Sequence, residues 1–267
     1  MKFASLGSGS EGNALLISAG AGATRTNVML DCGFAVRETE RRLARLGIAP
    51  GELSGIVVTH EHSDHVSGVF KFARRHQVPV WLSHGTLRAV ESDTRADTRD
   101  VDIAICRDGQ AVTIGALELL PYTVPHDARE PIQYVASDGH LKLGVLTDAG
   151  HVTAHLVAAL SGCDALVLEC NHDLQMLANS AYPPSLKRRI SGAYGHLSND
   201  SSSAILAALD KSRLRRVIGA HLSQQNNTPA LAHAAILRGL GDVTAEIRIA
   251  CQADGFDWIA LSDFATA

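Results

Sequence analysis

The sequence predicts one α/β domain (α+β in some schemes), built as a four-layer αββα sandwich. Its first part is rich in short apolar strands with helices between them, and its second part alternates strand and helix. No Gly-x-Gly-x-x-Gly motif opens a helix, so a doubly wound nucleotide-binding sheet lacks its main support. With 267 residues and 46% hydrophobic content, the chain can bury one large core, and we expect a single domain over residues 1–267.

Runs of β-branched and apolar residues, bounded by glycine or polar turns, predict the elements of the first half. Strands are expected at residues 2–6, 14–18, 27–30, 56–58 and 78–82. Helical spacing predicts helices at residues 37–46, after residue 66, and at 84–90. The charged stretch 92–100 predicts an exposed loop or lid.

The second half begins with strand-like residues 101–124 and a hairpin, whose Asp138-Gly139 turn joins strands 132–137 and 142–146. After it, helices are expected at 152–160, 185–190, 200–209 and 229–240, and strands at 165–168, 216–220, 246–250 and 256–261.

Composition excludes several classes of protein. The net charge of −4 leaves no basic surplus that would indicate a broad nucleic-acid or anionic-membrane surface. No apolar stretch approaches the ~20 residues that span a bilayer, and no signal-like core follows the first methionine. The cysteines are odd in number and form no Cys-x-x-Cys pair, which is typical of reduced thiols in the cytoplasm. They are Cys32, Cys106, Cys163, Cys170 and Cys251.

The densest chemical signal is His-Glu-His-Ser-Asp-His at residues 60–65, directly after the predicted strand 56–58. His60 and His62 can point to one side of such a turn, and Asp64 and His65 to the other, so one loop could serve two neighbouring cations. Imidazole suits Zn²⁺, and the carboxylate also accepts harder ions such as Mn²⁺. An exposed polar turn is the plain alternative, but it does not explain three histidines and an acid in six residues.

Further polar residues follow other predicted strands, and ligands gather at the carboxyl ends of strands in α/β layers. These residues are His126, Asp148, Glu169, His196 and His221. Each of these residues taken alone is weak evidence for a metal site, because an isolated histidine is more often structural and Asp148 could cap a helix.

The motif His-x-His-x-Asp-His after a strand resembles the metal motif of the metallo-β-lactamase superfamily, whose architecture is the αββα sandwich. The resemblance implies two divalent ions, Zn²⁺ or Mn²⁺, and Asp148 bridging them. It assigns His60, His62 and His126 to one ion and Asp64, His65 and His221 to the other. Asp31, in Leu-Asp-Cys-Gly, resembles the acid that supports the metal loop by hydrogen bonding.

The expected chemistry is hydrolysis by an activated water, with Asp64, His196 and Glu169 as catalytic residues. His196 is the candidate proton donor to the leaving oxygen, and Glu169 would fix its tautomer. The pair resembles the Glu and His of the nuclease branch of the superfamily, including tRNA 3′-processing enzymes. Alternatively, Glu169 is a buried ion-pair partner and His196 caps a helix.

Three stretches, 8–13, 182–199 and 220–228, resemble the YycJ/WalJ-like group of the superfamily. That resemblance implies a 5′-to-3′ exonuclease acting on double-stranded DNA, with no membrane and no protein partner implied. Phosphate contacts are expected from local groups, although a basic triplet can equally be a solvated helix face. These groups are Ser10, Asn13, Lys187, Arg188, Arg189 and Asn199.

Two other functions remain open from the sequence. One is a small-molecule hydrolase of the same fold that acts on a thioester, a lactone or a small phosphodiester. The other is a non-catalytic regulatory protein that keeps its metals for structure.

Overall fold

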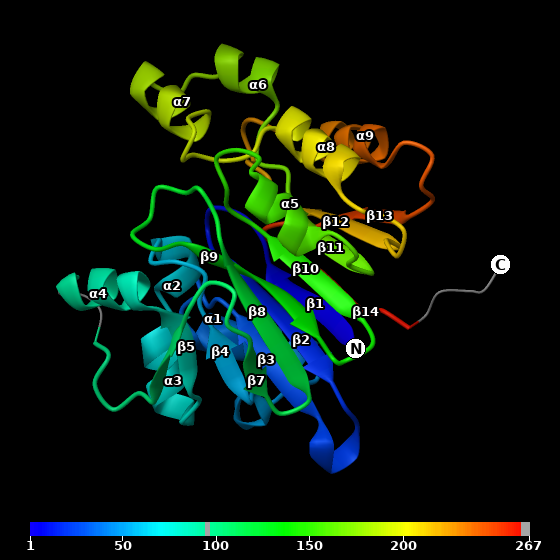
Figure 1. The fold of residues 1–267 in the computed structure, drawn as a ribbon. Coiled ribbons are helices and arrows are strands. Elements are labelled where there is room, and N and C mark those ends of the chain that lie inside the picture. Colours follow the sequence, from blue (N-terminus) through cyan, green and yellow to red (C-terminus); the bar gives the residue numbers. More distant parts are fainter. Residues whose placement is uncertain (94–96, 263–267) are drawn as a thin grey trace.

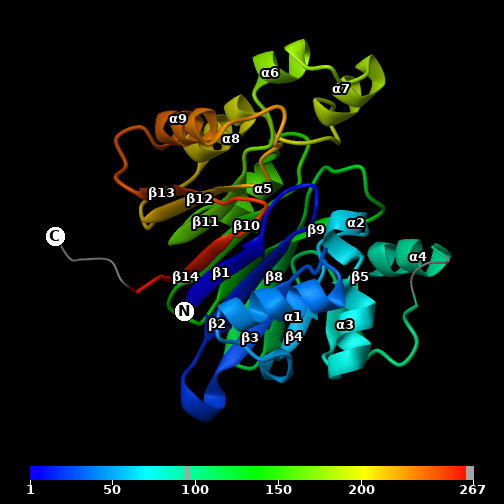
Figure 2. The same cartoon turned by 180° about the vertical axis from the view of Figure 1, so that it is seen from behind.

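The computed structural model describes residues 1–93 and 97–262, and it shows two mixed sheets packed face to face with helices on both outer faces (Figures 1 and 2). This is the four-layer αββα sandwich that the sequence predicts. Part of the expected loop 92–100 lies outside the described residues.

The first sheet has seven strands in the order β14-β1-β2-β3-β4-β5-β6. The strands are β1 (Lys2–Gly7), β2 (Ala14–Ala19), β3 (Thr26–Leu30), β4 (Gly55–Val57), β5 (Val80–Ser83), β6 (Ile103–Cys106) and β14 (Phe256–Ala260). Its helices are α1 (Val36–Arg45), α2 (Ser63–Val66), α3 (Val69–His76) and α4 (His84–Ser92). Two 3₁₀ turns, Gly22–Thr24 and Pro50–Glu52, lie in its connections.

The second sheet also has seven strands, in the order β13-β12-β11-β10-β9-β8-β7. The strands are β7 (Val112–Ile114), β8 (Leu117–Thr123), β9 (Ile132–Ser137), β10 (Lys142–Leu146), β11 (Ala165–Glu169), β12 (Arg216–Ala220) and β13 (Glu246–Ile249). Its helices are α5 (Ala154–Leu160), α6 (Leu174–Asn179), α7 (Pro184–Ile190), α8 (Asn199–Ala208) and α9 (Pro229–Leu240).

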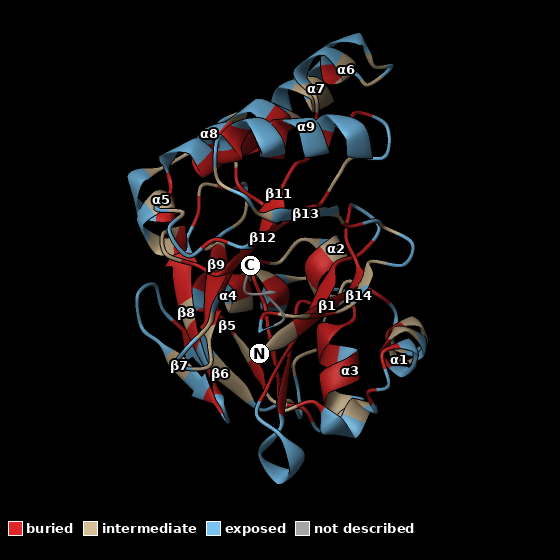
Figure 3. Cartoon of the chain, turned by 90° about the vertical axis from the view of Figure 1, so that its right-hand side faces the viewer, coloured by how far each residue is buried: buried red, intermediate tan, exposed pale blue. Residues whose placement is uncertain are grey.

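Three layers of apolar side chains hold the sandwich together, and the central strands between them are almost wholly buried, whereas edge strands such as β13 are partly exposed (Figure 3). The central layer joins the two sheets and includes Ile17 and Tyr134. The outer layers lie under the helices, with Phe72 of α3 on one side and Ile205 of α8 on the other. Strands covered on both faces read as continuous apolar runs, which is why these strands were visible in the sequence.

Parallel pairing brings the functional residues to one edge of the sandwich. Strands β3 and β4 are parallel, and so are β10, β11 and β12. The residues that follow these strands therefore leave the sheets in the same direction. The register pairs Glu169 at the end of β11 with Ala220, the residue before His221.

The segment between β11 and α8 contains two short helices. The sequence indicates a helical region that ends at the prolines of residues 182–184, and α6 lies in it, beginning where Asp173 accepts hydrogen bonds from the backbone N–H groups of Gln175 and Met176. Together with α7 it stands out from the sandwich beyond the carboxyl ends of the strands (Figures 1 and 3). The metal loop is also shorter than expected, because α2 already begins at Ser63.

Candidate metal centre

Three histidines form the first group of donor atoms. His60 and His62 follow β4, and His126 follows β8. Their ring centroids are 4.6 to 4.9 Å apart, and Nδ1 of His62 lies 3.2 Å from Nε2 of His126. One ring nitrogen from each lies within 4.8 Å of the other two, so the three could hold one ion.

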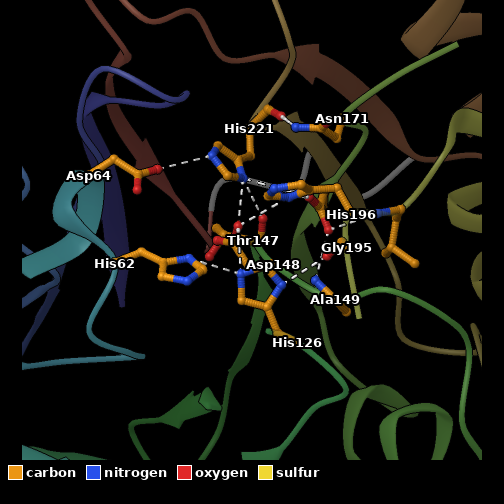
Figure 4. Close-up of polar contacts among 12 residues, drawn as sticks. His62, Asp64, His126, Thr147, Asp148, Ala149, Asn171, Gly195, His196 and His221 are labelled. Carbon is orange, nitrogen blue, oxygen red and sulfur yellow. Dashed lines mark hydrogen bonds and ion pairs between the residues drawn. The ribbon is translucent and has the colours of Figure 1, made fainter. Parts of the chain in front are cut away.

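A second group adjoins the first. Oδ2 of Asp64 lies 3.4 Å from Nε2 of His65 and 3.5 Å from Nε2 of His221. Asp148 lies between the two groups: its Oδ2 is 3.1 Å from Nε2 of His65, and its Oδ1 is 3.9 Å from Nε2 of His126. Figure 4 shows this carboxylate with imidazoles on several sides. The structure thus brings together all seven residues expected to bind metal.

Backbone and carboxylate acceptors orient the imidazoles. Nδ1 of His126 donates to the carbonyl of Gly195 at 2.8 Å, and Nδ1 of His221 donates to that of Thr147 at 2.7 Å. In both rings the Nε2 atom is left for the site. Tethering of one ring nitrogen while the other binds the ion is the usual arrangement of histidine metal ligands.

Donor atoms without partners show that the site suits cations. Within the described residues, Nε2 of His60 has no hydrogen-bond partner although the residue is buried. Oδ2 of Asp148 accepts no well-formed hydrogen bond either, in spite of its nearness to His65. Burial lowers the pKa of His60, which favours the neutral imidazole that a metal requires. A buried site with free lone pairs and carboxylates fits divalent ions.

Electrostatics within the second group point the same way. Burial lowers the pKa of His65 and of His221, but Asp148 and the neighbouring carboxylates outweigh it and hold both pKa values well above the usual range. Burial opposes ionisation of Asp148, yet His221 and His65 hold its pKa well below the usual range. Positive charge near these carboxylates is therefore stabilising, and either protons or metal ions can supply it.

Asp31 braces the metal loop from the end of β3. Its carboxylate accepts hydrogen bonds from the backbone N–H of Thr59 at 2.8 Å, from the Thr59 hydroxyl at 2.9 Å, and from Nδ1 of His65 at 2.8 Å. The residue is 1% exposed and has a left-handed backbone, with φ of 61°. Its contacts are those of a support and not of a ligand.

Glu169 and His196 form a pair beside Asp148. Nδ1 of His196 donates to Oε1 of Glu169 at 2.8 Å, and the other oxygen of Glu169 accepts from the backbone N–H of Ala149 at 2.9 Å. Burial lowers the pKa of His196, but Glu169 and Asp148 outweigh it and raise that pKa to about 9.

The helix caps near the site are other residues. Ser198 caps α8 and Thr153 caps α5, so neither His196 nor Asp148 has the capping role that the sequence left open.

An open cleft of about 270 Å³ lies over the donor atoms. Ser10 and Arg189 line it, together with His62, Asp64 and His196. The guanidinium of Arg189 is held at its mouth by Asp127, with Nε 2.7 Å from Oδ2. Lys187 instead donates to the carbonyl of Ala178 at 2.6 Å, and Arg188 is exposed on the same helix.

Two of the expected phosphate contacts are not at the surface. The Asn13 side chain is buried, and its amide donates to Gly9 and lies 3.1 Å from Nε2 of His65. The Asn199 side chain is buried as well and exchanges two hydrogen bonds with Asn227. Both asparagines therefore brace loops near the cleft, because their amide groups already have protein partners.

Asp127 and Asn171 line or border the site and were not singled out in the sequence. Oδ1 of Asp127 lies 3.5 Å from Nε2 of His126, and Asn171 donates to the carbonyl of His221 at 3.1 Å. The sequence pointed to these two residues only by their position: Asp127 directly follows His126, and Asn171 lies two residues after Glu169.

Comparison with known proteins agrees with this geometry. The family described as "Beta-lactamase superfamily domain" matches residues 26–222. The chain belongs to this superfamily. It is 34% identical over 236 residues to the exodeoxyribonuclease YycJ of Bacillus anthracis, with 88% of each chain covered. It is 29% identical over 240 residues to the exodeoxyribonuclease WalJ of Streptococcus pneumoniae, covering 90% of this chain and 88% of that one.

Solved structures share the superfamily fold. The metallo-beta-lactamase fold protein YhfI from Bacillus subtilis superposes with a TM-score of 0.72 at 13% identity, over 97% of this chain and 99% of that one. The resemblance seen in the sequence, to the superfamily and to its YycJ/WalJ-like group, is therefore confirmed. No helix in the described ranges is both long and apolar enough to cross a bilayer.

Proposed function

We propose that the chain is a metal-dependent phosphodiesterase that shortens double-stranded DNA from its 5′ end. The observation that carries the proposal is the pair formed by Glu169 and His196, because it places a proton donor next to the candidate metal ligands. The similarity to two exodeoxyribonucleases over most of the chain supports DNA as the substrate.

Seven residues would hold two divalent ions, either zinc or manganese. His60, His62 and His126 would hold one, Asp64, His65 and His221 the other, and Asp148 would lie between them. Two such ions, when bound, lower the pKa of water and stabilise negative charge on a phosphoryl group.

His196 would protonate the leaving oxygen. Its Nδ1 atom donates to Glu169, so Nε2 is the atom that holds the transferable proton. The backbone N–H groups of Ala149 and Leu197 donate to Oε2 of Glu169 and hold this carboxylate in place. Its Oε1 atom therefore fixes the orientation of the His196 ring. General acid catalysis of this kind contributes about 10²- to 10⁴-fold in rate.

Arg189 and Ser10 would position the substrate phosphate. Both line the cleft, and among the described residues that line it Arg189 alone is an arginine or a lysine. Arginine suits this role because its planar guanidinium binds phosphate oxygens in a fixed geometry. Asp127 would keep the guanidinium at the cleft until a phosphate competes for it.

A small-molecule hydrolase is a weaker candidate. Hydroxyacylglutathione hydrolase of Rhodopseudomonas palustris matches only 33% of this chain. The cleft is open and lined by charged and polar groups, whereas a small-molecule site is mostly apolar.

We also propose a cytoplasmic location, supported by five cysteines that are all free thiols.

The decisive experiment uses metal-free protein resupplied separately with Mn²⁺ and Zn²⁺ on end-labelled double-stranded DNA. We expect progressive shortening from the 5′ end, lost in Asp148→Ala and in His196→Ala but kept in His233→Ala, which changes an exposed histidine on α9. Absence of cleavage by protein that carries two ions would refute the DNA substrate.

A further inference from the structure

His172 is a buried histidine outside the metal centre with no assigned role. It is 1% exposed, and neither of its ring nitrogens has a hydrogen-bond partner among the described residues. A buried polar group without a partner is unfavourable, and most such groups in proteins are paired. Most buried histidines are paired, so the ring of His172 has hydrogen-bonding capacity that no described residue uses.

The side chain of His172 borders a hollow of about 420 Å³, which we call the α8 hollow. It lies between the residues after β10, the start of α6, the end of α7 and one face of α8. Its lining includes Val152, Leu174, Ser198, Ser201 and Ala204. The volume is within the range of about 300 to 1,000 Å³ that is usual for small-molecule sites.

The α8 hollow and the metal cleft share one wall, because His196 lines both. His196 is the candidate proton donor to the leaving oxygen. A substrate whose phosphate lies over the metal ligands would therefore extend past His196 into the α8 hollow on its leaving side.

The charges differ between the two spaces. The metal cleft contains Arg189, whereas no lysine or arginine is among the described residues that line the α8 hollow. Apart from His196, which the hollow shares with the metal cleft, its one charged lining residue is Asp200, which is paired with Arg238 at 2.5 Å. The hollow offers serine hydroxyls, a neutral imidazole and apolar contacts, which suit an uncharged ring with hydrogen-bonding edges and do not suit a phosphate. Burial lowers the pKa of His172, which favours the neutral ring.

We propose that the α8 hollow binds the nucleoside that carries the leaving oxygen, and that the ring of His172, whose nitrogens are covered in this structure, turns to hydrogen-bond the base or sugar. This inference rests on the proposed phosphodiesterase function. In the reaction, the oxygen of water forms a bond to phosphorus, and the bond from phosphorus to the nucleoside oxygen breaks. The nucleoside oxygen takes the proton from His196, and the proton released by the water passes to solvent.

Two substitutions test the hollow without altering the metal ligands. Ala204→Phe fills it from an exposed position on α8, and Ala207→Phe is the matched control, since Ala207 is exposed on the same helix but does not line the hollow. His172→Phe removes both nitrogens and puts a larger aromatic ring in their place. No hydrogen bond is lost, so a fall in its melting temperature would report overpacking of the buried site, and binding is therefore compared at a temperature where all the variants are folded.

The readout is binding of each of the four deoxynucleosides to metal-loaded protein by equilibrium dialysis, with DNA cleavage measured alongside. We expect at least one deoxynucleoside to bind the unsubstituted protein and Ala207→Phe, and not to bind Ala204→Phe. His172→Phe should weaken that binding by about threefold to tenfold, the value of one hydrogen bond.

Deoxynucleoside binding tests the α8 hollow, and DNA cleavage by the unsubstituted protein tests the proposed function. Equal deoxynucleoside binding by all four proteins, or none by the unsubstituted protein, would overturn the inference. Equal KM and kcat on DNA for Ala204→Phe and Ala207→Phe would overturn it as well. Failure of the unsubstituted protein to cleave DNA would instead count against the proposed function.

Discussion

Nδ1 of His65 donates a hydrogen bond to Oδ2 of Asp31 at 2.8 Å, and this bond ties the metal loop to the end of β3. The same carboxylate accepts two hydrogen bonds from Thr59, the residue before His60. One buried acid therefore sets the start of the loop and the ring orientation of a histidine six residues later.

Asp31→Asn should weaken metal binding although Asp31 is not a proposed ligand. The amide lacks the charge that orients and polarises His65, and loss of such a partner lowers metal affinity by about 10- to 100-fold. Metal dissociation constants, measured by competition with a chelator, would test this. Asp242→Asn, at an exposed position, is the control, and equal affinities for the two variants would exclude a bracing role for Asp31.

Gly33→Ala should disturb the metal loop through its backbone. A Cβ at residue 33 would lie 1.8 Å from the carbonyl oxygen of Asp64, so the loop must move. We expect a lower melting temperature and weaker metal binding. In Gly51→Ala the added Cβ meets nothing within 4 Å, so metal affinity should be retained. Similar metal affinity in both variants would contradict the predicted displacement.

Glu169→Gln should separate proton transfer from metal binding. It removes the charge behind His196 while keeping hydrogen-bonding oxygen and nitrogen atoms, so we expect two ions to remain bound and kcat to fall by about 10²-fold or more. Metal content by mass spectrometry and single-turnover cleavage of DNA would be measured together. A loss of metal in step with activity would mean that Glu169 acts through the ions.

Arg189→Ala should weaken DNA binding and reduce its dependence on salt. Removing one phosphate contact lowers the slope of log K against log[salt] by about 1. Arg188→Ala is the matched control, because Arg188 is exposed on the same helix but does not line the cleft. Fluorescence anisotropy at several salt concentrations would measure both slopes, and an unchanged slope for Arg189→Ala would refute the phosphate contact.

One of the five thiols should react quickly in the native protein. Burial raises the pKa of Cys32, Cys163 and Cys170 to about 12, and it also raises that of Cys106, so little thiolate forms at these sites near pH 8. Cys251 is exposed. A disulfide reagent should therefore modify about one thiol in native protein and five after denaturation, and Cys251→Ser should abolish the native reaction. Rapid modification of a second thiol would contradict the buried positions.

The sequence by itself determined the strands, the metal loop and the order of the candidate ligands. Both faces of each central strand are buried, so apolar runs such as residues 56–58 mark the strands without reference to the rest of the chain. Functional residues such as His60 and Asp148 then stand out because they are polar and directly follow such runs.

Only the tertiary structure decided which of these residues meet and what else meets them. Parallel pairing of β10, β11 and β12 joins Asp148 and His221, which are distant in the chain, and no local pattern encodes that pairing. The burial of Asn13 likewise depends on packing against the metal loop. The unpaired ring of His172 depends on the space between separate helices. Local propensity and hydrophobic periodicity fix the elements, whereas contacts between distant segments fix the site.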